Sequence, residues 1–173
     1  RAAVTLLTTM MDNPFGYGRV VRTRSGVKAV VEEKDASPAQ KKIQEVNAGI
    51  YCFEKKFLLS SLDRLGKNNA QGEYYLPDAI SIAGKKGLGV SALLCKDADE
   101  VMGVNTRYDL SRAERFLRAR INRHWMQEGV TMLDPDSIFV GSDVSLGRDT
   151  VLYPNVRLEG KTTLGGSCMV YPG

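Results

Sequence analysis

The chain has 173 residues, of which 43% are hydrophobic and 25% charged, and its formal net charge is +4. These values are typical of one globular domain or at most two small ones, and they exclude a disordered chain. No apolar run approaches the roughly 18 residues that a membrane-spanning helix needs. Three scattered cysteines and one histidine exclude a disulfide framework and a multi-histidine metal cluster. The chain begins without methionine and stops inside a repeat, so we expect it to be a piece of a longer protein.

The first hundred residues alternate predicted strands with predicted helices, which is typical of an α/β domain. Strands are predicted at 2–9, 19–22, 27–33, 50–53 and 89–95, and helices at 37–46, 56–65 and 76–83. The second and third strands are expected to form a hairpin across 23–26. Ser37 and Pro38 supply an N-cap and a first-turn proline for the first helix.

A long helix is predicted to begin at Thr106, because Asp109 three residues later completes a capping box. Apolar residues keep helical spacing as far as Trp125, and Gly129 ends the helix. Six arginines fall within 107–123. They are a hint of nucleic-acid binding, but no nucleic-acid motif and no base-stacking aromatic residues accompany them. We therefore expect no nucleic-acid partner.

Beyond this helix the sequence repeats every six residues. One column of the repeat is aliphatic throughout: Val140, Leu146, Leu152, Leu158, Leu164 and Val170. A second column of the same period holds small or β-branched residues: Ile138, Val144, Thr150, Val156, Thr162 and Cys168. Six consecutive aliphatic residues in one frame would arise by chance roughly once in ten thousand. A hexapeptide repeat predicts a parallel β-helix, in which each repeat gives one short strand and one corner.

General catalytic motifs are absent from the sequence. Residues 16–18 are not a dinucleotide fingerprint, because the third glycine and the following helix are missing. His124 beside Trp125 is expected to pack or to lie on the surface, and Glu32 and Glu33 alone would be a solvated strand end. Three cysteines are expected to be buried thiols in a reducing compartment: Cys52, Cys95 and Cys168. These patterns alone predict an α/β domain joined to a β-helix, with no visible catalyst.

Five segments occur in the order found in one enzyme family. They are FGYGRVVR at 15–22, VVEEKDAS at 30–37, IQEVNAGIY at 43–51, NNAQGEYYLPD at 68–78 and VMGVNTR at 101–107. With these segments, the chain closely resembles, over essentially all of its residues, the bacterial bifunctional N-acetylglucosamine-1-phosphate uridyltransferases/glucosamine-1-phosphate N-acetyltransferases. The hexapeptide region after an arginine-bearing helix fits the same family independently.

The resemblance implies a two-part α/β fold. Its first part is the C-terminal half of a Rossmann-like nucleotide-diphospho-sugar transferase domain, and its second part is the start of a left-handed parallel β-helix. The implied boundaries are 1–105 for the sugar-binding half of the uridyltransferase domain, 106–128 for a linking helix and 129–173 for the first β-helix coils of the acetyltransferase domain. The family's nucleotide loop would precede this chain and the acetyltransferase residues would follow it. We therefore expect the 173-residue chain alone to be inactive.

For the site, the resemblance implies six substrate contacts and no catalytic residue. The matched positions are Gly18, Glu32, Asn47, Glu73, Tyr75 and Asn105. The Gly18 backbone would contact the acetamido region, Glu32 would accept hydrogen bonds from sugar hydroxyls, and the Asn47 amide would contact the sugar. Asn105 would also give an oxygen ligand to the catalytic Mg²⁺, a hard cation. Pro77 stands where the family has threonine, which removes a hydroxyl and a backbone donor near the sugar.

The implied reaction joins UTP to N-acetylglucosamine 1-phosphate, forms UDP-N-acetylglucosamine and releases pyrophosphate. Positioning and charge stabilisation dominate such an in-line displacement at phosphorus. Mg²⁺ is the implied cofactor, and acetyl-CoA is the co-substrate of the second reaction. The resemblance also implies a cytoplasmic homotrimer as the full-length parent, with no membrane and no nucleic-acid partner.

Two alternative functions stay open at this point. The chain could belong to another sugar-1-phosphate nucleotidyltransferase with a β-helix tail, which would differ in its preferred sugar or base. It could instead be a non-catalytic trimerisation module, in which case Glu32→Ala and Asn47→Ala would leave every activity of the parent unchanged. RNA binding by the arginine-rich helix is a more distant alternative, and strongly salt-dependent binding would be its mark.

Overall fold

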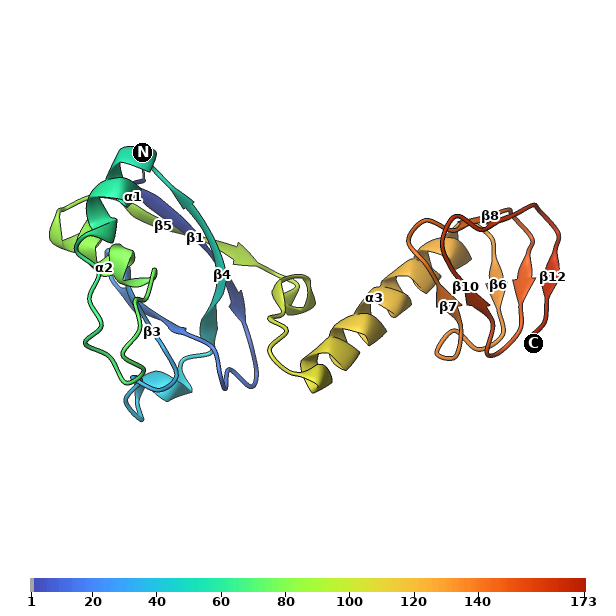
Figure 1. The fold of residues 1–173 in the computed structure, drawn as a ribbon, viewed down its shortest axis with the longest axis horizontal. Helices are drawn as coiled ribbons and strands as arrows, with labels where there is room; N and C mark the ends of the chain where they lie inside the picture. Colours follow the sequence, from blue (N-terminus) through green and yellow to red (C-terminus); the bar gives the residue numbers. More distant parts are fainter. Residues whose placement is uncertain (1) are drawn as a thin grey trace. The chain divides into compact units, whose positions relative to one another are not determined.

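The computed structural model describes residues 2–173, which form two compact units that divide between Gly103 and Val104. The first unit is built on a five-stranded sheet with the strand order β3-β2-β4-β1-β5 (Figure 1). Its strands are β1 (Val4–Met10), β2 (Arg19–Thr23), β3 (Gly26–Val31), β4 (Glu45–Phe53) and β5 (Val90–Cys95). Within this sheet β1 and β5 run parallel, and the other neighbours run antiparallel. The predicted hairpin is confirmed as β2 and β3, which lie at one edge.

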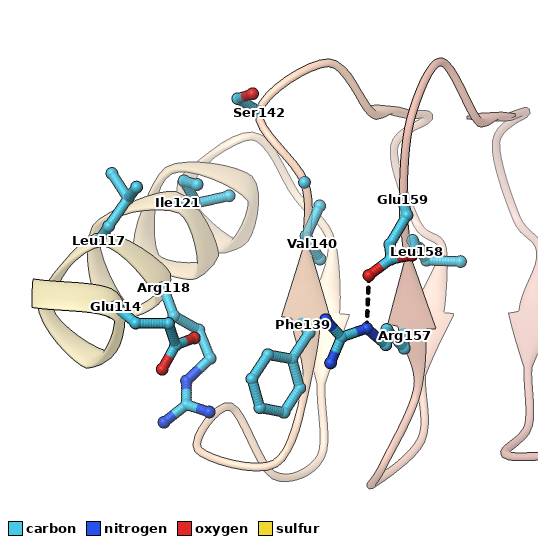
Figure 2. A pocket seen from close by; sticks show the side chains of 11 residues that line it. Glu114, Leu117, Arg118, Ile121, Phe139, Val140, Ser142, Arg157, Leu158 and Glu159 are labelled. Carbon is cyan, nitrogen blue, oxygen red and sulfur yellow. Dashed lines mark hydrogen bonds and ion pairs between the residues drawn. The ribbon is translucent and has the colours of Figure 1, made fainter. Parts of the chain in front are cut away.

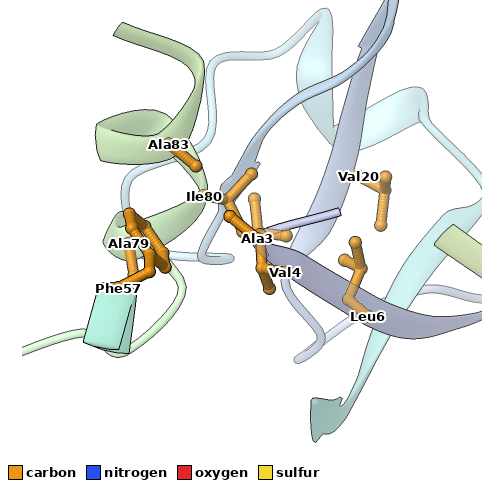
Figure 3. Packing of buried hydrophobic residues seen from close by; sticks show 9 residues of the cluster. Ala3, Val4, Leu6, Val20, Phe57, Ala79, Ile80 and Ala83 are labelled. Carbon is orange, nitrogen blue, oxygen red and sulfur yellow. The ribbon is translucent and has the colours of Figure 1, made fainter. Parts of the chain in front are cut away.

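Two short helices, α1 (Lys55–Leu62) and α2 (Asp78–Lys85), pack on one face of this sheet. The core between them and the strands is made of small and aliphatic side chains with one aromatic ring: Ala3, Val4, Leu6, Val20, Val30, Phe57, Ala79, Ile80 and Ala83 (Figure 3). Val4 and Leu6 share this core because alternate residues of a strand point to the same face. This packing fixes the strands β2, β3 and β4, which position Gly18, Glu32 and Asn47 of the six predicted site residues.

Residues 37–46 differ from the prediction. The structure has a short 3₁₀ helix, η1 (Gln40–Lys42), and β4 begins three residues after its end, so the predicted helix is wrong. The N-cap of η1 is Ala39 and not the predicted Ser37, although the Ser37 hydroxyl accepts a hydrogen bond from the N–H of Gln40 at 3.3 Å. The helix cannot continue because Val46 pairs with Thr9 of β1. Strand pairing with a distant segment overrides the local capping signal.

The cysteines are more exposed than predicted. Cys52 is exposed, the other two are partly exposed, and all three are free thiols. Cys52 follows Tyr51 on β4, and adjacent side chains of a strand point to opposite faces of the sheet. Tyr51 packs against the core. Cys52 therefore lies on the opposite face of the sheet, where Ile50 and Leu93 are also exposed. The predicted burial of Cys52 is wrong because the described residues leave this face open.

The second unit begins with α3 (Arg107–Gln127), and the predicted capping box starts this helix. The Thr106 hydroxyl accepts a hydrogen bond from the N–H of Asp109 at 3.1 Å, and Asp109 Oδ2 accepts one from the N–H of Thr106 at 2.9 Å. His124 is exposed, with its ring 5.2 Å from that of Trp125, as expected. No helix within residues 2–173 is both long enough and apolar enough to cross a bilayer.

Seven two-residue strands follow α3, and their pairings are all parallel. They are β6 (Thr131–Met132), β7 (Phe139–Val140), β8 (Ser145–Leu146), β9 (Val151–Leu152), β10 (Arg157–Leu158), β11 (Thr163–Leu164) and β12 (Met169–Val170). From β7 onward a strand begins every six residues, which is the predicted period. β7 pairs with β10, β8 with β11 and β9 with β12, so each strand lies beside the strand 18 residues further along. We call 18 residues one round.

Both predicted columns belong to the core of the second unit. Their buried members are Ile138, Val140, Val144, Leu146, Thr150, Leu152 and Val156. Their later members are partly buried: Leu158, Thr162, Leu164, Cys168 and Val170. From α3, Ile121 and Trp125 pack against the same cluster. One apolar core is therefore shared by the helix and the three ladders.

Asn122 joins α3 to the first corner of the second unit. It is 1% exposed, and its Nδ2 donates to the carbonyl oxygens of Pro135 and Ile138 at 2.8 and 2.9 Å. The corner is longer than the later ones, because β6 begins at Thr131 and β7 at Phe139, eight residues apart instead of six. The buried amide thus satisfies carbonyl groups of the irregular corner that no strand pairing reaches.

Gly147 marks a close approach between two successive rounds. A Cβ at this position would overlap the backbone of Gly165 and Gly166. The adjoining Thr150 hydroxyl donates to the carbonyl oxygen of Gly165 at 2.9 Å, which holds the rounds together at this point. Glycine is required at 147 for space.

Candidate functional site

Gly18 and Glu32 come together at the adjacent ends of β2 and β3, where Arg19 pairs with Val31. A Cβ on Gly18 would lie 2.9 Å from Glu32 Oε1 and 2.8 Å from Val30 Cγ1. The backbone of Gly18 is not in the left-handed region, so the constraint is one of space. A larger residue at this position would displace the carboxylate of Glu32.

Asn47 on β4 joins this pair from the neighbouring strand. Its N–H donates to the carbonyl oxygen of Gly18 at 2.9 Å, and its Oδ1 accepts from the N–H of Gly49 at 3.1 Å. Further along β4, the buried hydroxyl of Tyr51 makes no hydrogen bond of good geometry within the described residues. Burial, opposed by the Asn47 amide and assisted by the charge of Glu32, raises the pKa of Tyr51 to about 12. Tyr51 therefore stays a neutral hydroxyl beside these two polar side chains.

The electrostatic setting of Glu32 differs from that of an exposed glutamate. Burial raises the pKa of Glu32, the charges of Asp35 and Asp78 raise it further, and Arg19 opposes the shift. Within residues 2–173 no side chain donates a hydrogen bond to the Glu32 carboxylate. Because a half-buried carboxylate needs donors, it is well suited to accept hydrogen bonds from hydroxyl groups of a ligand.

The loop that carries Glu73 and Tyr75 is tied to the segment after β3. Lys34 Nζ donates to Gln71 Oε1 at 2.7 Å, and Asp35 accepts a backbone N–H of the same loop at 2.8 Å. The Gln71 amide also donates to the Tyr75 hydroxyl at 2.7 Å. Partial burial raises the pKa of Tyr75, and the nearby carboxylates add to this shift. Tyr75 therefore lies close enough to Glu32 for the charge of that carboxylate to contribute to the raised pKa of Tyr75, whereas the side chain of Glu73 is exposed.

An open pocket of about 450 Å³ lies between these segments. It is lined by one aromatic ring, two carboxylates, two lysines, an amide and a glycine: Phe15, Gly16, Glu32, Glu33, Lys34, Lys41 and Gln71. Phe15 is 75% exposed at this position. An apolar ring together with donors and acceptors of both charges suits a polar ligand that also has an apolar face. Of the predicted residues, Glu32 lines the pocket, and Gly18 adjoins it through its contact with Glu32.

A second groove of about 200 Å³ lies within the second unit, between α3 and the strands β7 and β10 (Figure 2). The ring of Phe139 forms part of its wall, with the guanidinium carbons of Arg118 and Arg157 at 4.5 and 5.0 Å from the ring centroid. Leu117 and Ile121 line the side formed by α3. None of the predicted site residues lies in this groove.

Asn105 belongs to the second unit, directly before the N-cap of α3. Its N–H donates to Asp109 Oδ2 at 3.3 Å, and the residue is exposed. The amide oxygen is a hard donor of the kind that Mg²⁺ prefers. No three acidic, histidine or cysteine side chains within residues 2–173 are grouped so that they could hold a metal ion. Asn105 could therefore supply one ligand, and its place in a shared site stays a prediction.

Arg19 and Glu33 were not identified from the sequence as parts of this region. Arg19 is 2% exposed and pairs with Glu33 at 2.6 Å, and Lys41 lies 3.4 Å from the other oxygen of that carboxylate. The expectation that Glu33 belongs to a solvated strand end is therefore wrong. The alternation of buried and exposed residues along a strand could not have predicted that Arg19 is buried, because the adjacent Val20 is buried as well.

Comparison with known proteins gives many curated relatives, and no protein-family model matches. The bifunctional protein GlmU of Trichlorobacter lovleyi is 51% identical over 168 residues, which are 96% of this chain and 36% of that protein. GlmU of Geobacter metallireducens is 49% identical over 173 residues, 99% of this chain and 36% of that protein. A putative glucose-1-phosphate thymidylyltransferase structure from Bacillus anthracis, with 22% identity and a TM-score of 0.47, covers 65% of this chain and 42% of that one, which is too little likeness to support a conclusion.

The chain spans little more than a third of the length of these curated relatives. A third relative, GlmU of Clostridioides difficile, gives the same picture, with 48% identity over 96% of this chain and 36% of that protein. With about half of its residues identical over nearly its whole length, the chain belongs to the family of bifunctional GlmU proteins.

Proposed function

We propose that this chain is the sugar-phosphate-binding part of an enzyme that makes UDP-N-acetylglucosamine. The complete reaction transfers a uridylyl group from UTP to N-acetylglucosamine 1-phosphate and releases pyrophosphate. The second activity of the complete enzyme would acetylate glucosamine 1-phosphate with acetyl-CoA. The observation that carries the proposal is the meeting of Gly18, Glu32 and Asn47, three residues from separate motifs, where the ends of β2 and β3 lie beside β4.

The proposed roles follow from the geometry of these residues. Because Gly18 has no Cβ, the Glu32 carboxylate can lie against its backbone, and a ligand bound there would meet both groups. Glu32 would accept hydrogen bonds from sugar hydroxyls, and the Asn47 amide would both donate and accept. Tyr75 and Glu73 would contact the sugar from the loop that is tied to Asp35, beside Gln71, which lines the pocket. Together these groups would hold the sugar phosphate in place, which is the main task in phosphoryl-group displacement.

Mg²⁺ is part of this proposal through Asn105. Its exposed amide oxygen would be one hard ligand, and substrate phosphates and water would supply the others, as is usual for this cation. When bound, Mg²⁺ supplies stabilisation of the negative charge that develops at the phosphoryl group. Asn105 itself would bind and orient, without taking part in proton transfer.

We propose the domain boundaries 1–105, 106–128 and 129–173, with the last segment as the first part of a left-handed parallel β-helix. The six-residue recurrence of the strands and their pairing one round apart support this assignment. In the complete protein, this region would support the acetyl-CoA-dependent reaction and the formation of trimers.

The test is a titration of the ¹⁵N-labelled chain with N-acetylglucosamine 1-phosphate, followed by NMR. We expect saturable shifts of the Gly18 and Asn47 amides, weaker binding of glucose 1-phosphate, and no UDP-N-acetylglucosamine formation by the chain alone, since it holds no glycine-rich nucleotide loop. Glu32→Gln should weaken binding about tenfold, because charged hydrogen bonds to the sugar are lost. Absence of shifts at millimolar ligand, or shifts elsewhere in the chain, would overturn the proposal.

A further inference from the structure

An ion pair between the buried Arg19 and the partly exposed Glu33 lies beside the turn that carries Gly18. Arg19 is 2% exposed, and its Nη2 lies 2.6 Å from Glu33 Oε2. Its Nη1 donates to the carbonyl oxygen of Tyr17. The same oxygen of Glu33 accepts a long hydrogen bond from the N–H of Gly16 at 3.4 Å. The ion pair therefore contacts two backbone atoms of the turn.

Further contacts complete the attachment of this turn. The carbonyl oxygen of Gly18 accepts the N–H of Asn47 at 2.9 Å, and the Tyr17 hydroxyl accepts the N–H of Gly103 at 3.1 Å. Each residue from 16 to 18 thus has a backbone atom held by a partner outside the turn. A turn without regular structure would otherwise be mobile, and ordering it on binding would cost affinity.

A contribution to folding stability alone does not explain why this position holds an ion pair. Removing the Arg19 guanidinium from water carries a large free-energy cost, and apolar residues often fill such a place equally well. Arg19 also leaves its Nε buried without a hydrogen bond within the described residues. The pair does, however, give the turn two directional contacts that apolar side chains could not make.

We propose that Arg19 and Glu33 are positioning residues, which hold the turn of residues 16–18 so that the Gly18 backbone and the Glu32 carboxylate face the sugar together. This inference rests on the proposed function. Arg19 is too deeply buried to touch a ligand, so it acts through the turn. Glu33 lines the pocket, so its variant alone could not separate positioning from direct contact.

The chain offers a matched control three residues further along β2. Arg22 forms an ion pair of the same length with Glu45, with two nitrogen–oxygen distances of 2.6 Å. Glu45 lies on β4, so this pair also links two strands, but it does not contact the turn. Loss of the control pair should lower stability and leave sugar binding unchanged.

The experiment compares Glu33→Gln, Arg19→Lys and the control Glu45→Gln by urea unfolding and by titration with N-acetylglucosamine 1-phosphate. Lysine keeps the charge but cannot reach Glu33 and the Tyr17 carbonyl oxygen at once. We expect Kd to rise about tenfold in Arg19→Lys and Glu33→Gln, and less than twofold in Glu45→Gln. We also expect the Gly18 amide signal, at saturating ligand, to shift less or to broaden in the first two variants.

The outcomes are distinct. If the wild-type chain binds the sugar phosphate and the variants Arg19→Lys and Glu45→Gln have equal Kd values, the positioning role is wrong and the proposed function is unaffected. A wild-type chain that does not bind the sugar phosphate would overturn both. If Glu33→Gln does not fold, Arg19→Lys against Glu45→Gln decides the question. An unchanged Gly18 signal in a weakly binding Arg19→Lys variant would also contradict the inference.

Discussion

In the first unit, paired strands come from distant parts of the sequence, and Val4 of β1 pairs with both Phe53 and Val90. In the second unit, each strand from β7 onward lies beside the strand one round further along. Because the paired strands are distant in sequence, irregular segments connect the strands and helices of this unit. Gly18, Glu32 and the loop 68–75 lie in these segments. In the second unit, by contrast, nearly every residue belongs to a strand ladder, a corner or the core. The candidate sugar site therefore lies in the less regular unit, where connecting segments are free to carry ligand-binding side chains.

The largest effect should come from Gly147→Ala in the second unit. The added Cβ meets backbone that cannot turn aside, so we expect a loss of about 3 kcal/mol in the free energy of unfolding. Fluorescence of Trp125, the single tryptophan, reports this unit during urea unfolding. Gly165→Ala is the matched control, because nothing lies within 4 Å of its Cβ position, and it should change stability by less than about 0.5 kcal/mol. Equal losses for both variants would contradict the close approach of the rounds.

Asn122→Ala should have the next largest effect, about 2 kcal/mol, because two buried carbonyl groups lose their donor. The loss should appear in the unfolding transition seen by Trp125, while amide signals of the first unit keep their own midpoint. Asn122→Asp is a useful second variant, since it keeps the shape but removes the amide donor. A simultaneous shift of both transitions would show that the two units unfold as one, which would contradict separate stability of their two cores.

Gly18→Ala should separate binding from stability. Its Cβ would meet only the side chains of Val30 and Glu32, which can move, so we expect a loss of about 1 kcal/mol in stability. The displaced carboxylate should raise Kd for N-acetylglucosamine 1-phosphate about tenfold or more. Unfolding and NMR titration of the same sample measure both effects. Unchanged binding would exclude Gly18 from the sugar site.

The smallest effect concerns pH. The hydrogen bond from Arg22 holds the pKa of Glu45 below its usual value of 4.5. A carboxyl group with a lowered folded pKa stabilises the protein above its unfolded pKa, and this contribution is lost as pH falls through the folded value. We expect wild type to lose about 0.5 kcal/mol from this partly exposed pair below about pH 4.5. Urea unfolding of wild type and Glu45→Gln at pH 7 and pH 3.5 tests this, and the variant should show a smaller decline.

The pKa of Glu32 is shifted in the opposite direction from that of Glu45, because burial raises it. Proton uptake by this carboxyl group favours the folded state as pH falls, but it removes the charge that would accept sugar hydroxyls. Sugar binding should therefore weaken at a higher pH than the one at which the first unit loses stability. Binding and unfolding that decline at the same pH would contradict the assigned difference between Glu32 and Glu45.

The periodic parts of the molecule were the most predictable ones. A six-residue column and the Thr106 capping box depend on neighbours that are close in sequence, so local pattern was sufficient for them. Residues 37–46 do not form the predicted helix because Glu45 and Val46 pair with β1, more than thirty residues away. The exposure of Cys52 likewise depends on what covers the second face of the sheet, which local pattern does not describe.

Motif matching found the residues of the candidate site, and the structure added their spatial relation. Gly18, Glu32 and Asn47 are up to 29 residues apart, yet hydrogen bonding and steric contact join them. Arg19 could not be predicted, because burial of a charge depends on a partner fourteen residues away. An arginine next to a glycine turn has the same appearance in a sequence whether it is exposed or buried.

The long first corner of the second unit has a consequence for how such a region can change in length. Between β6 and β7 the chain has two residues more than at later corners, and the core columns beyond keep their frame. Extra residues at a corner cost only a small loop entropy, whereas one extra residue inside a strand would move every later core side chain out of register. The corners are thus the places where peptides or tags can be inserted, and Asn122 shows that a long corner can be held by a single buried amide.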